Sequence, residues 1–470
     1  MGKGLRTLEF SFEDTDLTHF GGLVLMQRFC QCLRLRWLLQ RDLNIPHRSG
    51  DFQPADLLLA MLYILMAGLR RVSKTEILQY NGVFLSLLGL ERFPYASSLR
   101  RFLHRLSPQA VRQLVRLHDR LRRRLFALPH PSSALTFDLD SVVLTVYGEQ
   151  QGARLGYNPK KRGRRSYHPL LCFESQRQEF WHGSFRPGNV AAKTGAVRFM
   201  EYCLAKVPST LARSRVRVRA DSGFYDGNLL GMLENKGCGY VVVAKQFRTI
   251  QRRAQAVRFQ KLRHGWETAQ FSYQAHGWPK ARRFVVIRRP IPQDPQEAAQ
   301  LTLFRDRHYT YEVLVTNLKL SPWRVGRFYA PRATVEKIIR ELLYDLPLNQ
   351  IPTSRWIANV AFFHTMMLAY NLVHWFKRLC LGKAYATATV ETVRRDFLAV
   401  PAGSPVRQVA MCCNCPAPTR CRKNFSKPSE NSKGFASQKP EFVSEPKSNN
   451  QYLHAFLHIE SPFHAFLRLK

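Results

Sequence analysis

The stretch LTFDLDSV at residues 135–142 decides how the middle of this chain folds. Three apolar residues alternate with polar ones up to Asp138 and Asp140, the period-two pattern of a strand with one apolar face. A second stretch, RVRVRADSGFYD at 215–226, alternates in the same way and ends in Asp221, after which Ser222-Gly223 breaks the strand. The sequence therefore predicts two strands that each end in a carboxylate.

A third acidic residue lies in a predicted helix, within YAPRATVEKIIRELL at 329–343. The apolar residues of this segment follow a four-three-four spacing that faces a core (Val335, Ile339, Leu342 and Leu346). Arg332, Glu336 and Arg340 are four residues apart, so they share a neighbouring face. If this helix packs on the sheet, Glu336 reaches the same edge as the two aspartates.

Three carboxylates at one edge suit phosphoryl transfer, because oxygen ligands hold a pair of Mg²⁺ ions about 4 Å apart. The neighbouring arginines would hold a phosphate or keep the glutamate ionised. A structural interpretation also exists: Asp at a strand end is commonly a cap or turn residue, and Glu between arginines is commonly a surface ion pair. Asp138 shares a strand face with Asp140, so the residues alone leave the choice between them open.

The composition favours a polyanionic partner. Lys and Arg number 72 against 33 Asp and Glu, a formal net charge of +39 over 470 residues. Such an excess attracts nucleic acid through counterion release, and arginine suits bidentate phosphate contacts. The alternative is a ribosome-associated or merely solvated basic surface.

The sequence also predicts a cytoplasmic protein, associated with the nucleoid through DNA, and no membrane contact. Six of the ten cysteines are scattered among apolar neighbours, as reduced core thiols would be. The first 16 residues lack the apolar stretch of a signal peptide. The most apolar run, VAFFHTMMLAYNLVHWF, is interrupted by His364, Asn371 and His374, which favours a buried helix over a membrane span.

The pattern along the chain predicts an α/β protein in five parts. These are a helical N-terminal DNA-binding region (1–130), the first half of a catalytic core (131–247), a β-rich insertion (248–320), the second half of the core with helices (321–400), and a low-complexity tail predicted to be disordered (401–470).

Several motifs in order resemble the DDE transposases of bacterial insertion sequences, and most of all the insertion-sequence thirteen-eighty family. They are GEQQGARLGYNPKKRGRRSYHPLL (148–171), FRPGN (185–189), RADSGF (219–224) and Y-x-x-R-x-x-x-E from Tyr329 to Glu336. The resemblance covers about residues 90–400. It implies an RNase H-like catalytic core interrupted by the β-rich insertion, and cut-and-paste chemistry on DNA ends.

The resemblance assigns roles residue by residue. Asp140, Asp221 and Glu336 match the catalytic, Mg²⁺-binding acids, with Mn²⁺ as the expected substitute, and Asp140 is favoured over Asp138 because Ser141 follows it as in relatives. Tyr329 and Arg332 match the Tyr and Arg of a Tyr-Arg-Glu-Lys signature that contacts the transposon end. The lysine of that signature falls on Leu343, so Arg340, one turn earlier, is the expected substitute.

Two basic segments are predicted to bind DNA. A phosphate clamp is expected in the loop after the first strand (Lys160, Lys161, Arg162, Arg164 and Arg165), and a short basic helix is expected to present Arg100 and Arg101. Solvated charge is the alternative for both.

The predicted function is cleavage of double-stranded DNA at the terminal inverted repeats of an insertion sequence, followed by joining of the 3′-OH ends to target DNA. A homodimer is expected, because two ends must be paired. The alternatives are an RNase H-like nuclease that does not join strands and a catalytically inactive DNA-binding remnant.

Overall fold

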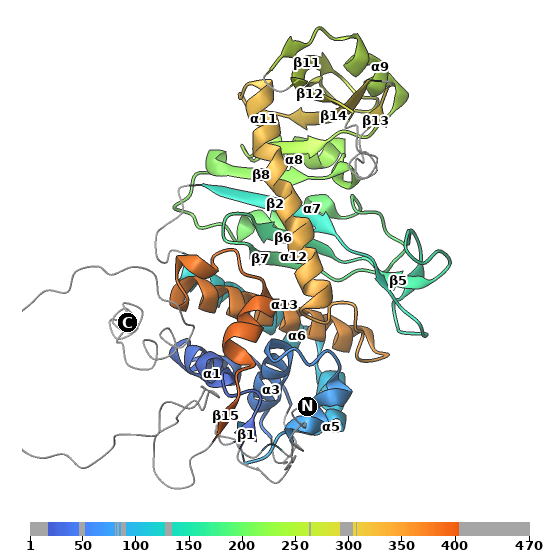
Figure 1. The fold of residues 1–470 in the computed structure, drawn as a ribbon. Helices are drawn as coiled ribbons and strands as arrows, with labels where there is room; N and C mark the ends of the chain where they lie inside the picture. The colour runs from blue at the N-terminus through green and yellow to red at the C-terminus, as the bar shows by residue number, and fades with distance from the viewer. Residues whose placement is uncertain are drawn as a thin grey trace, which may run out of the picture.

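The structure, a computed structural model, describes residues 17–46, 52–79, 81, 84–85, 91–126, 134–262, 265–291, 304–306 and 308–403. Along these residues a helical region comes first, a large mixed sheet follows, and further helices return beside the first ones (Figure 1). The fold is thus mixed α/β.

The first helices form a compact helical region. It consists of α1 (Leu23–Cys32), α2 (Leu35–Asp42), α3 (Pro54–Met66), the 3-10 helix η1 (Val72–Leu78), α5 (Ala96–Arg105) and α6 (Pro108–Phe126). Helix α6 begins at Pro108, where the Ser107 hydroxyl accepts a hydrogen bond from the Ala110 amide at 3.1 Å. Its apolar side is buried, whereas Arg112, Arg116 and Arg120 are exposed.

Ten strands of the described residues form one sheet. Its order is β7-β6-β2-β8-β9-β14-β12-β11-β10, with β13 paired to β14. Strand β2 is antiparallel to β6 and parallel to β8, and β8 is parallel to β9. The strands are β2 (Leu135–Ser141), β6 (Leu170–Glu174), β7 (Glu179–Ser184), β8 (Val216–Ala220), β9 (Gly239–Val243), β10 (Gln260–Lys261), β11 (Glu267–Tyr273), β12 (Arg282–Pro290), β13 (Phe304–Arg305) and β14 (Tyr309–Thr316).

The segment predicted as a β-rich insertion, 248–320, is built into this sheet. Helix α9 (Arg248–Ala256) precedes its strands and buries Ile250 and Ala254, which lie four residues apart. Strand β14 then pairs antiparallel with β9, with Val315 opposite Val242. The central sheet therefore runs on into the segment without a break.

Helices cover both faces of the sheet. Helices α7 (Ala196–Ala205) and α8 (Gly227–Asn235) share one core with the apolar face of β2 and β8. On the other side, α11 (Pro322–Tyr329), the 3-10 turn η5 (Ala330–Arg332) and α12 (Ala333–Tyr344) form a nearly continuous helical rod across the strands (Figure 1). Gly326 lets α11 approach β12, because a Cβ there would stand 2.1 Å from Ile287.

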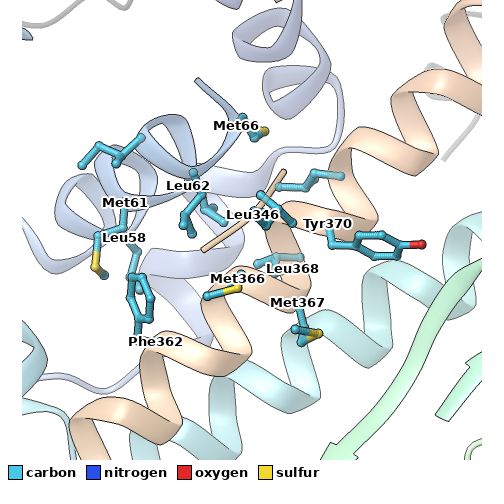
Figure 2. Packing of buried hydrophobic residues seen from close by; sticks show 14 of the residues in the cluster. Leu58, Met61, Leu62, Met66, Leu346, Phe362, Met366, Met367, Leu368 and Tyr370 are labelled. Carbon is cyan, nitrogen blue, oxygen red and sulfur yellow. The ribbon is translucent and has the colours of Figure 1, made fainter. Parts of the chain in front are cut away.

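Helix α13 (Trp356–Cys380) is buried along most of its length. Figure 2 shows Phe362 and Met366 of α13 beside Leu58 and Met61 of α3, all in one hydrophobic cluster. Among the described residues α13 is the one helix long and apolar enough to cross a membrane by composition, yet 83% of its most apolar window is buried inside the protein. The apolar run is thus a buried helix, as the sequence predicts.

Helix α13 also joins the two ends of the described chain. Its hydrophobic cluster unites the N-terminal helices with α12, β6 and β7. The remaining elements are β1 (Leu17–Thr18), paired with β15 (Ala402–Gly403), the small sheet β3 (Leu144–Thr145), β5 (Arg165–Tyr167) and β4 (Arg154–Leu155), and the short helices η2 (Arg213–Arg215), η3 (Ser222–Phe224), η6 (Lys383–Tyr385), α14 (Val390–Val393) and η7 (Arg394–Leu398). Residues 404–470 of the predicted tail lie outside the described residues.

Asn371 is a buried polar residue that ties α13 to the sheet. Its side-chain oxygen accepts a hydrogen bond from the Phe180 amide at 2.8 Å, and its nitrogen donates to the Phe180 carbonyl at 2.9 Å. The same nitrogen lies 2.7 Å from His118 Nε2 on α6. One side chain therefore satisfies polar groups of β7 and α6 in a region without solvent.

We expect Asn371→Leu to lower the free energy of unfolding by several kcal/mol, at about 1–3 kcal/mol for each buried polar group left unpaired. The control is Thr365→Ala on the same helix, because that hydroxyl bonds only the Ala361 carbonyl at 2.9 Å, one turn earlier. Urea unfolding of both variants measures the difference, and equal losses would contradict the proposed link between α13 and the sheet.

Candidate active site at the edge of strands β2 and β8

The register between β2 and β8 brings two carboxylates together. Leu139 pairs with Ala220 in the parallel ladder, so the next residue on each strand is Asp140 and Asp221. Both lie at the carboxyl ends of neighbouring strands. Asp221 also begins η3 as its N-cap, where its carboxylate accepts a hydrogen bond from the Gly223 amide at 3.0 Å.

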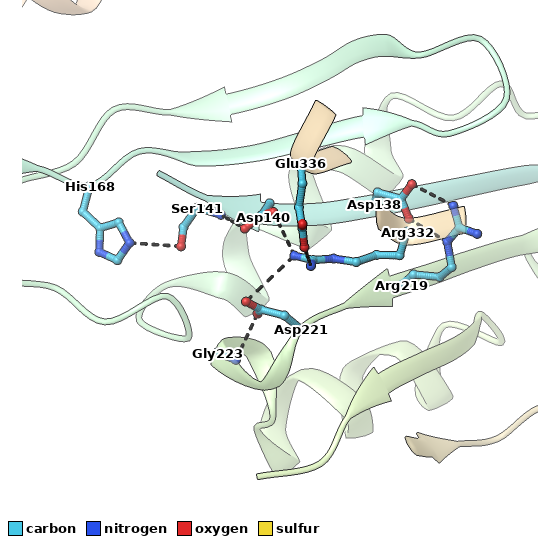
Figure 3. Close-up of polar contacts among 9 residues, drawn as sticks. All are labelled: Asp138, Asp140, Ser141, His168, Arg219, Asp221, Gly223, Arg332 and Glu336. Carbon is cyan, nitrogen blue, oxygen red and sulfur yellow. Dashed lines mark hydrogen bonds and ion pairs between the residues drawn. The ribbon is translucent and has the colours of Figure 1, made fainter. Parts of the chain in front are cut away.

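Helix α12 supplies the third carboxylate, and Arg332 joins all three. One guanidinium nitrogen of Arg332, Nη2, lies 2.8 Å from Asp140 and 3.9 Å from Asp221, while Nη1 lies 3.0 Å from Glu336 (Figure 3). Asp140, Asp221 and Glu336, hereafter the acid cluster, therefore converge on one cation. The arginine sits in η5, one helical turn before Glu336.

Exposure differs sharply within the acid cluster. The side chains of Arg332 and Asp140 are 9% and 11% exposed, whereas those of Asp221 and Glu336 are 42% and 65% exposed. Burial raises the pKa of Asp140 to about 7; the charges of Asp221 and Glu336 add to this rise and Arg332 opposes it. The cluster thus has a buried base, Asp140, and two carboxylates open to solvent.

Asp138, the alternative to Asp140, has a different partner. It lies opposite Arg219 in the ladder, and the two side chains form a bidentate ion pair at 2.7 and 2.8 Å. Arg219 also donates to the Phe328 carbonyl at the end of α11. Both side chains of the pair are 3% exposed. Asp138 is therefore paired with Arg219 within the sheet, whereas Asp140 is the aspartate that lies with Asp221 and Glu336 around Arg332.

The acid cluster fits divalent cations by the chemistry of its donors. All its ligating atoms are carboxylate oxygens, which Mg²⁺ and Mn²⁺ prefer. In the described part of the chain, no group of three or more His, Cys, Asp or Glu side chains is close enough to hold a metal ion directly. The Arg332 guanidinium lies between the carboxylates instead, so a cation at this place requires that guanidinium to move.

His168 and Ser141 support the site; in the sequence Ser141 served only to favour Asp140, and His168 was not singled out. The Ser141 hydroxyl lies 3.0 Å from His168 Nε2, and Nδ1 of the same ring is 2.8 Å from the Val190 carbonyl. A carbonyl only accepts, so Nδ1 carries the proton and Nε2 accepts from Ser141. Burial lowers the pKa of His168, which keeps the ring neutral. His168 lies in the SYHP stretch (166–169) of the motif at 148–171, which is the sequence feature that could have indicated it.

Arg186 gives the FRPGN motif a structural role. Its Nε donates to the His168 carbonyl at 2.9 Å, and Nη1 donates to the Thr194 carbonyl at 2.6 Å. These bonds hold the segment after β5 against the segment before α7. Arg186 therefore positions His168, and through it Ser141 beside Asp140.

The residues predicted to contact DNA fall into two groups. Tyr329 and Arg332 are buried, with Tyr329 in an apolar cluster between α11 and the sheet. The others are exposed: Arg100 and Arg101 on α5, Arg340 on α12, and Lys160, Lys161, Arg162, Arg164 and Arg165 between β4 and the start of β5. Leu343, where the resemblance implies a lysine, lines the same cavity as Lys160 and Lys161.

Truncating Asp138 and truncating Asp140 should have different effects on folding. Asp138→Ala leaves the buried Arg219 without its carboxylate, which we expect to cost about 3–5 kcal/mol of unfolding free energy. Asp140→Ala should cost less, because Arg332 retains Glu336 and Asp221. Urea unfolding distinguishes them, and Asp138→Leu with Arg219→Met should recover part of the loss. An Asp140→Ala variant as unstable as Asp138→Ala would contradict these assignments.

The raised pKa of Asp140 predicts that cation binding depends on pH. Below about pH 7 the carboxyl keeps its proton, so Mn²⁺ affinity should fall by up to about tenfold for each further pH unit. Above pH 7 the carboxylate is ionised and the affinity should level off. Mn²⁺ titration of the DNA-free protein from pH 5.5 to 8.5 measures this. A flat profile, or full binding by Asp140→Asn, would exclude Asp140 as the titrating ligand.

Comparison with known proteins confirms the resemblance to DDE transposases. A family model described as transposase DDE domain group 1 matches residues 3–423. No curated protein matches the chain. Among solved structures, the piggyBac transposase synaptic complex with hairpin DNA is similar at 12% identity and a TM-score of 0.45, over 82% of this chain and 80% of that one; so distant a likeness carries no argument. The family match spans most of the chain, which therefore belongs to the DDE-domain transposases of group 1.

Proposed function

We propose that this protein is the transposase of a bacterial insertion sequence, most like the insertion-sequence thirteen-eighty family. It would cut double-stranded DNA at the terminal inverted repeats and join the freed 3′-OH ends to target DNA. The observation that carries this proposal is the convergence of Asp140, Asp221 and Glu336 on the guanidinium of Arg332. Three carboxylates that could bind divalent cations once the Arg332 guanidinium moves away suit a reaction at a phosphodiester.

The strand order supports an RNase H-like core. Strands β7, β6 and β2 are antiparallel neighbours, and β8 and β9 continue the sheet in parallel with β2. The acid cluster lies at the carboxyl ends of β2 and β8, with Glu336 delivered by a helix across one face. The segment 248–320 between the second and third acids is the proposed insertion.

Asp140, Asp221 and Glu336 would hold the divalent cations, Mg²⁺ or Mn²⁺. Bound there, such ions lower the pKa of an attacking water and stabilise the leaving oxygen. Residues of the protein would bind the phosphate and hold the carboxylates in position. Arg332, once displaced from the carboxylates, would hold two oxygens of a phosphate in a bidentate contact. The buried Asp140 would fix the geometry, because the side chain of the adjoining Ser141 is hydrogen-bonded to His168.

DNA binding would rest on exposed cations of the helical region, of α12 and of the basic turn. Arg100, Arg101 and Arg340, with the basic turn at 160–165, would contact DNA phosphates and fix the position of the DNA. Pairing of two element ends would require a homodimer. We place the protein in the cytoplasm, on the nucleoid, in keeping with its net charge of +39.

The first test is cleavage of a labelled duplex that carries the terminus of the element, with Mg²⁺ or Mn²⁺. The wild type should cut at the element boundary and, with target DNA present, yield joined strands. Asp221→Ala should lose both products while keeping its fold by circular dichroism. Nicks without joined strands would instead indicate a nuclease, and salt-dependent binding without any cutting would indicate an inactive remnant.

A second test separates the roles of Arg332 and Glu336. Arg332→Ala should weaken binding of the element end by about tenfold, the loss of one charge-assisted contact. Glu336→Ala should bind the same DNA with little change and fail to cut it. Fluorescence anisotropy and gel-based cleavage measure the two effects, and the reverse pattern would overturn these roles.

A further inference from the structure

A groove lies at the carboxyl end of α12, away from the acid cluster. Its volume is about 460 Å³, and it lies between strand β3 with the residues after it, the basic turn at 160–165, and the end of α12. The groove, hereafter the Tyr147 groove, is lined on these elements by Tyr147, Gln150, Lys160, Lys161 and Tyr344, with Arg71 at its edge. A volume of this size holds a small organic ligand or one nucleotide.

The groove lies within reach of a strand held at the acid cluster. Tyr344 follows Glu336 by eight residues on the same helix, which corresponds to about 12 Å along its axis. Strand β3 continues from β2, the strand that ends at Asp140 and Ser141. At about 3.4 Å per nucleotide, three or four nucleotides span that distance. Any DNA strand that leaves the acid cluster along α12 therefore passes the groove.

The charge of the groove fits a phosphate. Arg71, Lys160 and Lys161 line it, and none of the described residues that line it is acidic. The side chains of these three cations form no hydrogen bond or ion pair with the described residues. Unlike Arg165, which pairs with Glu149, they keep their charge available for a ligand.

The turn that carries the two lysines is held in place by Asn158. This residue is 4% exposed; its amide nitrogen donates to the Thr145 hydroxyl at 2.9 Å, and its oxygen accepts from the Lys161 amide at 3.1 Å. Thr145 itself lines the groove on β3. The backbone of the turn that carries the lysines is thus anchored beside the groove.

Aromatic rings and an unpaired amide complete the lining. Tyr147 and Tyr344 are 72% and 60% exposed, which is unusual for side chains of that size. The side-chain oxygen of Gln150 is buried without a hydrogen-bond partner among the described residues. Flat exposed rings beside cations are the features with which proteins bind unpaired nucleotides, and an amide can pair with the edge of a base.

We propose that the Tyr147 groove binds an unpaired nucleotide of the DNA strand that leads away from the acid cluster. Lys160, Lys161 and Arg71 contact its phosphates, and Tyr147 and Tyr344 stack on its base. The proposal rests on the proposed function insofar as that function places DNA at the acid cluster. Simple contact with duplex phosphates is the competing outcome, which the following experiment decides.

The experiment compares the affinity of the full-length protein for two labelled DNAs in EDTA at fixed salt. One is a blunt duplex, and the other carries a four-nucleotide single-stranded overhang, made in both polarities. The wild type should prefer one overhang over the blunt end. Tyr147→Ala with Tyr344→Ala should reduce that preference by about tenfold, whereas Tyr147→Phe with Tyr344→Phe should keep it, because phenylalanine also stacks.

A matched pair of variants tests the cations. Lys160→Ala with Lys161→Ala should weaken overhang binding more than Arg154→Ala with Lys236→Ala, which removes the same charge from exposed positions outside the groove. Equal affinity of the wild type for both DNAs, or an unchanged preference in the double tyrosine-to-alanine variant, would overturn the proposal. This binding assay is done in EDTA and does not depend on cleavage. A protein that fails to cut DNA in the separate assay with Mg²⁺ or Mn²⁺ would therefore contradict the proposed function and leave the groove proposal intact.

Discussion

The pairing of β2 with β8 in one parallel register is the constraint on which the site depends. Asp140 and Asp221 are neighbours only because Leu139 lies opposite Ala220. One residue earlier, the buried pair of Asp138 and Arg219 bridges the same two strands. A slip of the ladder would break that ion pair inside the sheet, which is far more costly than loss of an exposed one. The same contact therefore fixes the register and, through it, the distance between the two aspartates.

A single helical rod then carries the third acid to that edge. Helix α11 packs on β12 and α12 crosses β2, so Glu336 is fixed from both sides. Arg219 adds a third attachment by donating to the carbonyl at the end of α11. At the far end of the rod, Glu341 lies 3.5 Å from His374 of α13. The position of Glu336 on α12 thus depends on the contacts of the rod with the sheet at one end and with the helical region at the other.

Local patterns in the sequence were enough to predict the elements that hold the acid cluster. Alternation showed β2 and β8, helical spacing showed α12, and the glycine and serine after Asp221 marked the break. What these patterns could not show is long-range. The pairing of β14 with β9, the packing of α13 on α3, and the burial of Arg332 among three carboxylates depend on residues far apart in the chain. The sequence predicts Arg332 as a phosphate contact, and the structure adds that its guanidinium pairs with all three acids.

The continuity of the sheet through β9 and β14 also limits how this protein can change. Strand β14 covers backbone groups of β9 that would otherwise stand open along one side of the core. An exposed strand of that kind, as apolar as Val241–Val243, invites pairing with another molecule. Shortening the segment between the second and third acids is therefore tolerable only if β14 remains. The short strands β10 and β13 do not protect β9 in this way, whereas a strand must remain in the place of β14 to keep the chain soluble.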